Sequence, residues 1–460
     1  MNPFLNPFFA FRVLKSYFVD VNRLWSINTS DLKKFQSKQL QRLVKYAYTV
    51  PFYHEKYKNA GVHPSDIQGI NDIGKLPFIS KDDIRKNFPD RIISSAADKS
   101  KMVKSYTSGT TGKPVSIYID MYTIVLGILG YVRVIKEHKV NWRKTRMTVI
   151  ADLSEHSAES EYLTDGMIPK LKPFFSLNNM QILHTYDDPK KLMKKIISFQ
   201  PEFIGGYPGM LRQLALLKNR GFGEDIQPKC ILSTGSVLDK FLKGYIEDSF
   251  KTQLFDTYGA MESGPMAFEC RQGKYHVHSD LVYLEFVDDD GKPVSPEEPG
   301  QSVVTRLYGR GTPIIRYTGL DDIITPSEDR CTCGLTGGFI SKIHGRESHS
   351  ITLPNGTVVL PSTLDEFIGE LYRSFNLDCI ERFQIIQPRI NKIEIYAVID
   401  NELRNTFPIE KLFSEIQHSF QEKFGSDIEV NVKEIDKIKP HTAGVISKVD
   451  RGKIKKKKYI

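Results

Sequence analysis

The pattern of apolar and polar positions changes character along the chain, and its first hundred residues favour helices. Leu40, Leu43, Val44 and Ala47 recur at the spacing of one helix face. Ser80, followed by two aspartates, is typical of a helix start. A helical, basic N-terminal region is therefore expected.

From about residue 101 onward, short apolar runs alternate with amphipathic helical patterns. This alternation predicts α/β layers with parallel strands, in which ligands bind where strands end. Helices are predicted at 189–199 and 209–220. Strands are predicted within 101–107, 115–119, 147–153, 201–208, 230–238 and 253–264.

After His276 the pattern becomes one of strands, within 275–288, 300–307 and 312–319, which predicts an antiparallel, barrel-like section. The last 110 residues or so alternate between helix and strand as an α+β unit, a normal size for a domain. We expect a large N-terminal domain over 1–345 and a small C-terminal α+β domain over 346–460.

Composition narrows the class of protein. The 460 residues are 40% hydrophobic, and no run approaches the roughly 18 apolar residues of a membrane span. Five cysteines without a secretion signal indicate a reducing compartment, hence the cytoplasm. The net charge of +9 is spread out, apart from a lysine-rich tail, and no nucleic-acid motif accompanies it. We expect no nucleic-acid partner.

The N-terminal segment leaves two interpretations open. Phe8, Phe11 and Phe18 are interrupted by Arg12 and Lys15. The segment is either a helix docked on the protein's own core or an interfacial helix resting on the inner face of a membrane.

Hydroxyl, glycine and lysine residues crowd into SYTSGTTGKP, residues 105–114, and suggest a phosphate-binding loop. Only two residues separate Gly109 from Gly112, where the Walker A pattern needs four. Pro114 stands where Walker A has Ser or Thr, and a strand pattern follows it. The segment is therefore a loop between two strands and not a Walker A motif.

This loop resembles the phosphate loop of the adenylate-forming enzymes, the superfamily of acyl-CoA synthetases, luciferases and peptide-synthetase adenylation domains. Segments TVPFYHEKYKNAGV and LPFISKDDIR are similar to its phenylacetate–coenzyme A ligase branch, which includes capsule-biosynthesis members. Further family motifs follow in order as TYGAMES (257–263), RYTGLDD (316–322), HGRES (344–348) and DRGKIKK (450–456).

The resemblance implies an ATP-dependent ligase. A carboxylic acid would attack the α-phosphate of ATP, giving an acyl-adenylate and pyrophosphate, and the acyl group would pass to coenzyme A or another thiol. The chemistry demands positioning and neutralisation of phosphoryl charge. The β- and γ-phosphates would be held by Thr107, Ser108, Gly109, Thr110, Thr111, Gly112 and Lys113.

The resemblance also assigns residues around the nucleotide. Glu262 would help hold Mg²⁺, a cation suited to carboxylate and phosphate oxygens. Tyr258, followed by Gly259, would stack on adenine, and the backbone of Gly235 and Ser236 would line it.

Three matches fall in the C-terminal motifs. Asp321, with Asp322 as a close competitor, matches the ribose-binding aspartate, and Arg346 would contact the nucleotide at the domain joint. Lys453 matches the catalytic lysine that stabilises the α-phosphate transition state, while Lys448 is a rival alignment.

Some positions depart from the family pattern, and other functions stay open. Met261 replaces the usual hydroxyl residue, and Ser348 replaces the common hinge aspartate. Alternatives are an adenylyltransferase that moves AMP to a non-thiol acceptor and an inactive nucleotide-binding scaffold in capsule polysaccharide biosynthesis. The acid is aromatic by analogy with one branch, or sugar-linked or an amino acid by analogy with the other; Tyr207 either faces it or packs.

Two cysteine-containing segments indicate a zinc site. Cys270 precedes His276 closely, and Cys331 and Cys333 follow as a pair, which together could supply three thiolates and one imidazole. Members of the resembled branch with similar positions hold a structural zinc. His278 is the alternative ligand.

Overall fold

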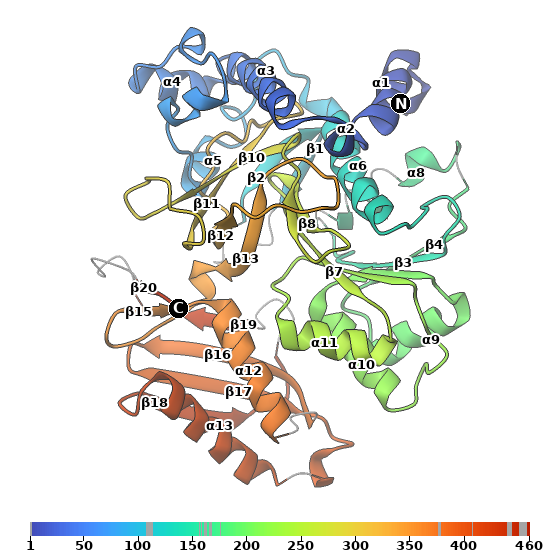
Figure 1. Ribbon diagram of the computed structural model, residues 1–460, viewed down its shortest axis with the longest axis vertical. Helices are drawn as coiled ribbons and strands as arrows, with labels where there is room; N and C mark the ends of the chain where they lie inside the picture. Colours follow the sequence, from blue (N-terminus) through green and yellow to red (C-terminus); the bar gives the residue numbers. More distant parts are fainter. Residues whose placement is uncertain are drawn as a thin grey trace. The chain divides into compact units, whose positions relative to one another are not determined.

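The fold is described from a computed structural model (Figure 1). It describes residues 2–106, 114–155, 157, 159, 160, 163, 164, 168–174, 176–375, 379–406, 408–438, 444–449 and 458–460. The chain divides into two compact units. The larger unit comprises Met1–Ser236, Ile246–Leu320 and Thr325–Lys342, and the smaller unit comprises Val237–Tyr245, Asp321–Ile324 and Ile343–Ile460. The predicted boundary after residue 345 stays a prediction.

The N-terminal region is helical, as predicted. Asn28 caps α3 by accepting a hydrogen bond from the backbone of Asp31, and Ser80 and Asp83 form a capping box at α5. No helix of the described ranges is long and apolar enough to cross a membrane. The helices are α1 (Pro7–Val19), α2 (Arg23–Ser26), α3 (Thr29–Ala47), α4 (Pro51–Asn59) and α5 (Lys81–Asn87), with 3-10 turns at Pro3–Leu5, Pro64–Asp66, Ile70–Lys75 and Lys99–Lys101.

Strands β1 (Met102–Tyr106) and β2 (Ser116–Asp120) form an antiparallel pair in which Tyr106 lies opposite Ser116. The segment that joins them carries the predicted phosphate loop, so its placement between two strands is confirmed. Residues 107–113 themselves lie outside the described residues. Asp120 then caps α6 (Met121–Glu137).

An eleven-stranded sheet organises the larger unit, and one half of it is parallel. β4, β3, β5, β6 and β7 lie side by side in parallel, as the alternation of strands and helices predicted. Figure 1 shows α9 and α10 together on one side of these strands. The elements are β3 (Met147–Ala151), β4 (Met180–His184), β5 (Phe203–Gly206), β6 (Cys230–Thr234), β7 (Leu254–Ala260), α8 (Ile168–Leu171), α9 (Pro189–Phe199), α10 (Pro208–Asn219) and α11 (Lys240–Phe250).

The expected barrel-like section is instead a continuation of this sheet. Its order runs β10-β11-β12-β13-β9-β8 into β7, and both β7–β8 and β8–β9 are antiparallel. The added strands are β8 (Gly264–Glu269), β9 (Tyr275–Val277), β10 (Val282–Val287), β11 (Gly300–Arg306), β12 (Asp322–Ser327) and β13 (Phe339–Arg346).

The prediction of a strand at 312–319 is wrong. Tyr317 makes only isolated bridges with Ile79 and Val304. Pro313 lacks an N–H for a ladder, and Arg316 has a φ of 45°, which a strand does not accommodate.

The smaller unit is α+β, as predicted. Apolar side chains of α12 and α13 share one core with the four-stranded sheet, whose order is β18-β17-β16-β19. A second sheet has the order β14-β15-β20. The elements are β14 (Ile351–Thr352), β15 (Thr357–Val359), α12 (Pro361–Phe375), β16 (Ile380–Arg389), β17 (Lys392–Ile399), α13 (Ile409–Phe424), β18 (Glu429–Glu434), β19 (Gly444–Ser447) and β20 (Lys458–Tyr459), with 3-10 turns at Glu347–His349 and Arg404–Thr406.

Candidate active site and metal centre

Three neighbouring strands of the larger unit carry predicted site residues at their carboxyl ends. Tyr207 follows β5, Gly235 and Ser236 follow β6, and Tyr258 and Gly259 lie in the last residues of β7. The strands are adjacent and parallel, so these positions meet at one edge of the sheet. Gly235 and Ser236 are exposed there, and Tyr258 is half-buried.

A close contact links Gly235 with Tyr207. Gly235 has a φ of 85°, and a Cβ built on it would lie 2.3 Å from Cε1 of Tyr207. Only glycine allows both this backbone conformation and this approach. The Tyr207 ring is thereby held against the segment predicted to line adenine.

Glu262 is buried just after the third strand, β7, and accepts hydrogen bonds from two side chains. Tyr317 Oη donates a 3.1 Å hydrogen bond to Glu262 Oε1, and Arg306 Nη1 donates a 2.9 Å bond to the Glu262 carbonyl. Burial, and then the Glu262 charge, raise the pKa of Tyr317, so the phenol stays a donor at neutral pH. This bond joins the TYGAMES and RYTGLDD segments in the larger unit.

Two residues at the strand ends escaped the sequence analysis. Glu159 Oε1 accepts a 2.6 Å hydrogen bond from Tyr207 Oη. Burial raises the pKa of Glu159 above its usual value. Tyr131 of α6 hydrogen-bonds the Thr234 side chain, and a Cβ on Gly259 would lie 3.4 Å from Tyr131 Oη. The same edge therefore presents a half-buried carboxyl and two phenols.

The smaller unit brings together the residues predicted at its joint. Asp321 Oδ2 accepts a 3.0 Å hydrogen bond from the Ser348 N–H, and the Asp321 carbonyl accepts one of 2.7 Å from the Glu347 N–H. Arg346 Nε lies 3.9 Å from the neighbouring Asp322 carboxylate. Asp321 has a φ of 63°, so its backbone is turned sharply at this position.

Two groups of predicted residues lie outside the described residues: the phosphate-loop residues 107–113 and Lys453. The rival lysine, Lys448, is described and exposed, just after β19. Its backbone N–H donates to the Gln387 carbonyl.

The predicted metal ligands converge in the larger unit. Cys270 follows β8, His276 lies in β9, and Cys331 and Cys333 lie between β12 and β13. One donor atom of each lies within 4.8 Å of the others. The Cys270 and Cys331 sulfurs are 3.7 Å apart, and Cys333 Sγ lies 3.2 Å from His276 Nε2.

These distances fit a tetrahedral zinc ion. Two sulfurs bound to one zinc at about 2.3 Å lie roughly 3.8 Å apart, whereas a disulfide would bring them to about 2.05 Å. Burial lowers the pKa of His276 to about 4, which keeps its imidazole neutral and able to bind a metal, and raises the pKa of Cys333 to about 12. A dication is what would hold that thiol as a thiolate.

The alternative ligand His278 is not part of the cluster. Its Nδ1 lies 2.9 Å from Nη1 of Arg133, a buried guanidinium that also donates to Asp280. The neighbouring ion pair therefore accounts for the position of His278.

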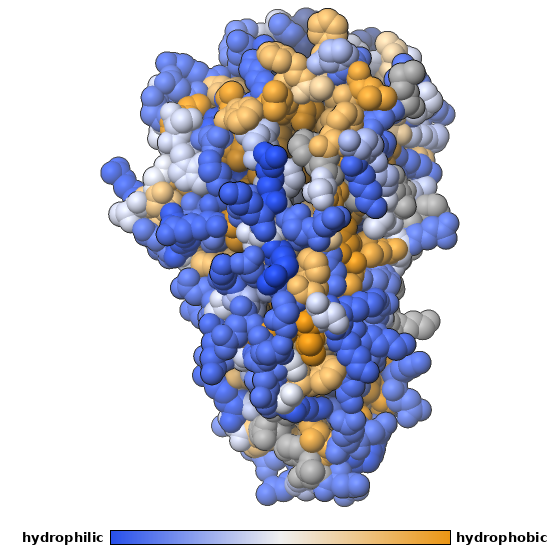
Figure 2. Space-filling model, turned by 90° about the vertical axis from the view of Figure 1, so that its right-hand side faces the viewer, coloured by the Kyte–Doolittle hydropathy of each residue, from blue (hydrophilic) through white to orange (hydrophobic). Residues whose placement is uncertain are grey.

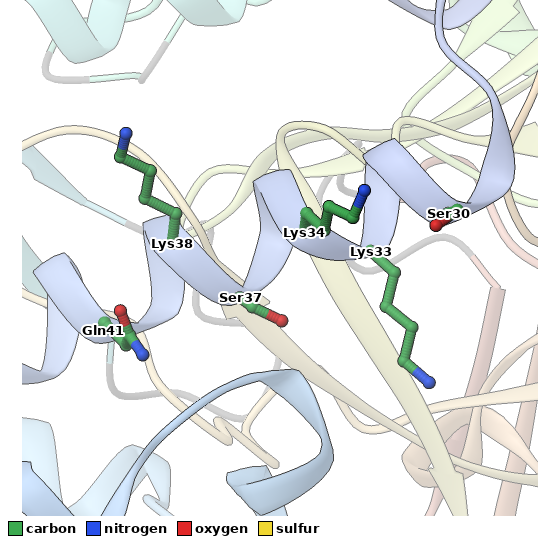
Figure 3. Close-up of a pocket in the computed structure, with 6 residues that line it drawn as sticks. All are labelled: Ser30, Lys33, Lys34, Ser37, Lys38 and Gln41. Carbon is green, nitrogen blue, oxygen red and sulfur yellow. The ribbon is translucent and has the colours of Figure 1, made fainter.

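A hollow of about 580 Å³ elsewhere in the larger unit holds none of the predicted residues (Figure 3). All its lining side chains come from α3, and Figure 3 shows Lys34 and Lys38 pointing away from Lys33 and Gln41. Side chains that diverge from one helix do not enclose a ligand, so this is a solvated helix face.

The arrangement has the fold of acyl-CoA ligases, as solved structures show. A 2-hydroxyisobutyryl-CoA ligase in the postadenylation state, in complex with 2-HIB-AMP, matches with a TM-score of 0.74 at 18% identity, over 93% of this chain and 91% of that one. The anthranilate CoA ligase AuaEII, in complex with anthranoyl-AMP, matches with a TM-score of 0.52 at 16% identity, over 82% and 73%. The predicted fold class is confirmed.

Sequence relatives are nearer and span the chain. Protein CapK of Staphylococcus aureus is 26% identical, over 94% of this chain and 91% of that protein. Phenylacetate-coenzyme A ligase of Thermus thermophilus is 24% identical, over 92% and 96%. Residues 351–451 match the family model of the CapK C-terminal domain. The resemblance to phenylacetate–coenzyme A ligases is thus confirmed, and the chain is also similar to protein CapK.

Proposed function

We propose that the chain is an ATP-dependent, AMP-forming acid–thiol ligase. A carboxylate oxygen attacks the α-phosphorus of ATP, the bond to the β-phosphate oxygen breaks, and pyrophosphate leaves. The sulfur of coenzyme A then attacks the acyl carbon, losing its proton, and AMP leaves with the bonding electron pair. The first step needs no general base because the acid is already an anion.

One observation carries the proposal: residues predicted to bind adenine lie at the adjoining ends of β6 and β7, beside the acid-pocket candidate Tyr207 after β5, in a chain related over its length to phenylacetate-coenzyme A ligases. There the backbone of Gly235 and the ring of Tyr258 would hold adenine. In the smaller unit Asp321 and Arg346 would hold the ribose and the phosphates.

Magnesium is proposed at Glu262. Its carboxylate is oriented by Tyr317 and lies three residues after Gly259. When bound, Mg²⁺ would offset the negative charge of the phosphates. The chain's own contribution is to hold this carboxylate still in a buried place.

The acid substrate is proposed to carry a hydrogen-bond donor. The Tyr207 ring contacts the proposed adenine segment, and its hydroxyl donates a hydrogen bond to the Glu159 carboxyl. A half-buried carboxyl is a poor neighbour for a purely apolar ring but a good acceptor for an ammonium or hydroxyl group. An amino or hydroxylated acid therefore fits better than phenylacetate itself.

A structural zinc is proposed on Cys270, His276, Cys331 and Cys333. Four ligands complete the shell of a structural site and leave no position for substrate. The ion would tie the turn after β8 to the segment before β13. Because ATP and coenzyme A are cytoplasmic and a zinc-thiolate site needs reduced cysteines, we propose that the protein acts in the cytoplasm.

Isotope exchange between ATP and pyrophosphate tests the function. A panel of aromatic, amino and hydroxylated acids should contain at least one that supports exchange. Lys453→Ala should lower the exchange rate by about 10²–10³-fold, the scale for loss of one electrostatic donor, and Lys448→Ala should leave it near wild type. This pair tests which lysine of the proposed C-terminal domain, residues 346–460, is the catalytic one.

Mass spectrometry after coenzyme A is added separates the outcomes. A thioester with free AMP supports the ligase. An AMP-linked acceptor without thioester would instead establish an adenylyltransferase, and tight ATP binding without exchange for any acid would establish an inactive scaffold.

A further inference from the structure

The outer face of α1 leaves an apolar surface uncovered. Phe8 is 87% exposed and Phe11 69% exposed. Among the residues that the structure describes, twelve large apolar side chains are exposed. Seven of them form this patch: Leu5, Phe8, Phe11, Leu14, Phe18, Val19 and the adjacent Phe174. Figure 2, which faces the side where α1 lies, shows apolar side chains gathered near the top of the view. We call these seven residues the α1 patch.

The opposite face of α1 is firmly attached to the larger unit. Buried Ser16 shares a 2.8 Å hydrogen bond with Tyr122 of α6, and Tyr17 Oη accepts one of 3.1 Å from Trp142 Nε1. The helix is therefore held in place by its inner residues. The aromatic residues of the α1 patch contribute little to that attachment.

The charges on α1 itself are of one sign, and Asp20, at its C-terminal end, is paired with Arg23. Arg12 and Lys15 lie on the exposed face, and α1 contains no Asp or Glu. The Arg12 guanidinium is fixed 3.4 Å from the centre of the Tyr122 ring. Segment 168–174 adds Lys170 and Lys172, also without an acid, and contacts the N-terminus through the bond from the Asn2 amide to the Lys170 carbonyl.

We propose that the α1 patch docks the protein on the surface of an anionic lipid bilayer. Phenylalanines enter the boundary between headgroups and acyl chains, and the four cations face the anionic headgroups. Thirteen residues of helix span about 20 Å, which is too short to cross the hydrocarbon core of roughly 30 Å. The helix lies on the membrane and does not span it.

A second copy of the chain fits the same patch less well. In a two-fold dimer the patch would face itself, so Arg12 and Lys15 of both copies would be brought together. Like charges in such a contact repel, whereas a bilayer with anionic lipid supplies the opposite charge over the whole face.

Cosedimentation with vesicles tests this inference independently of the ligase function. The full chain should bind vesicles of phosphatidylcholine with about one quarter phosphatidylglycerol at least tenfold more tightly than vesicles of phosphatidylcholine alone. The double variant Phe8→Gln/Phe11→Gln should bind the mixed vesicles about tenfold less tightly or worse. Lys15→Glu should weaken binding to the mixed vesicles but not to vesicles of phosphatidylcholine alone. Ile390→Gln, at a large exposed apolar residue of the smaller unit, is the matched control and should bind like wild type.

Thermal unfolding and analytical ultracentrifugation complete the test. The variants should keep the wild-type unfolding temperature, because the exchanged side chains are exposed. Equal binding of wild type and double variant overturns the proposal. The proposal is also overturned if the wild type is a dimer that does not bind vesicles and the double variant is a monomer. That result would assign the patch to contact with a second copy.

Discussion

At the scale of residues, the Cys/His cluster shows how a few side chains can be predicted from residue type together with a family resemblance. Cysteines are rare in this chain, so two short cysteine segments and a nearby histidine carry specific information. Strands β8 and β9 pair so that Phe268 lies opposite His276. Cys270 follows Phe268 by two residues, so the pairing brings it near His276. The cluster therefore depends on one hairpin and one loop.

Replacing Cys333 by Ser should release the metal. The purified wild type should carry about one zinc per chain, and the variant close to none, measured by inductively coupled plasma mass spectrometry. Loss of the ion should lower stability by on the order of 2–4 kcal/mol, seen as an earlier urea midpoint. Cys379→Ala, at a buried cysteine of the smaller unit, should keep the zinc. Zinc-free wild type of normal stability would contradict the site.

Glu159 could not be predicted from the sequence because no motif surrounds it. It lies 48 positions before Tyr207, and only the fold brings the carboxyl to the phenol. Tyr131, on α6, is even more remote from Gly259 in sequence. Family motifs indicate the residues expected to hold ATP, whereas the residues proposed to face the acid are found only from packing.

Glu159→Gln tests the proposed preference for a donor-bearing acid. The amide keeps the shape but loses the negative charge, so exchange with a cationic amino acid should fall by about tenfold while exchange with phenylacetate stays the same or rises. The ratio of kcat/KM for the two acids is the measurement. Glu410→Gln, on the exposed face of α13, is the control. An unchanged ratio would remove Glu159 from the acid-binding site.

At the scale of elements, the sequence predicts periodic segments well and irregular ones poorly. The helix expected at 189–199 is observed as Pro189–Phe199, because its apolar positions repeat at helical spacing and Asp188 caps it. The strand expected at 312–319 is absent, although its apolar content is high. There Arg316 is held out of strand geometry by a bidentate bond to Glu285 and by the Leu76 carbonyl, both distant in sequence.

The end of β6 should tolerate no side chain at Gly235. Gly235→Ala combines an unfavourable positive φ with a Cβ against the Tyr207 ring, so the ring and the adenine segment must move apart. We expect the rate of pyrophosphate exchange to fall by about 10²-fold, on the scale expected for a misplacement of about 1 Å.

Gly61→Ala supplies the matched control for this change. Gly61 has a φ of 66° but open space around the position of a Cβ, so it carries similar backbone strain without a clash. It should lose some stability and retain exchange. Equal activity of both variants would show that the strand end does not contact the nucleotide.

At the scale of the whole molecule, the sequence predicted the parallel strands and a C-terminal α+β fold. It did not predict that the parallel and antiparallel strands join in one large sheet. Periodicity reports each strand separately, whereas strand order depends on long-range pairing. The small segments Val237–Tyr245 and Asp321–Ile324, which cluster with the C-terminal residues, also carry no local signal. One consequence is a carboxyl group that is affected by an aspartate from a distant part of the chain.

Asp365 of α12 is that group, and it should make the smaller unit sensitive to alkaline pH. Burial, followed by the charges of Asp239 and Glu366, raises the pKa of Asp365 to about 8 from its ordinary 3.8. Between these values the folded state holds a proton that the unfolded state has lost, so stability falls as pH rises through this window. Asp365→Asn should remove that fall and gain on the order of 1–3 kcal/mol over wild type at pH about 9, with little gain at pH about 4.

Urea unfolding of both proteins across this pH range measures the effect, and Glu422→Gln, at an exposed carboxylate of α13, is the control. The control should follow the wild-type curve, because its carboxylate is solvated in both states. A variant curve parallel to that of wild type would mean that Asp365 is ionised in the folded protein at neutral pH. The carboxyl groups of Val237–Tyr245 and α12 would then be separated by solvent, and this segment could not belong to the core of the smaller unit.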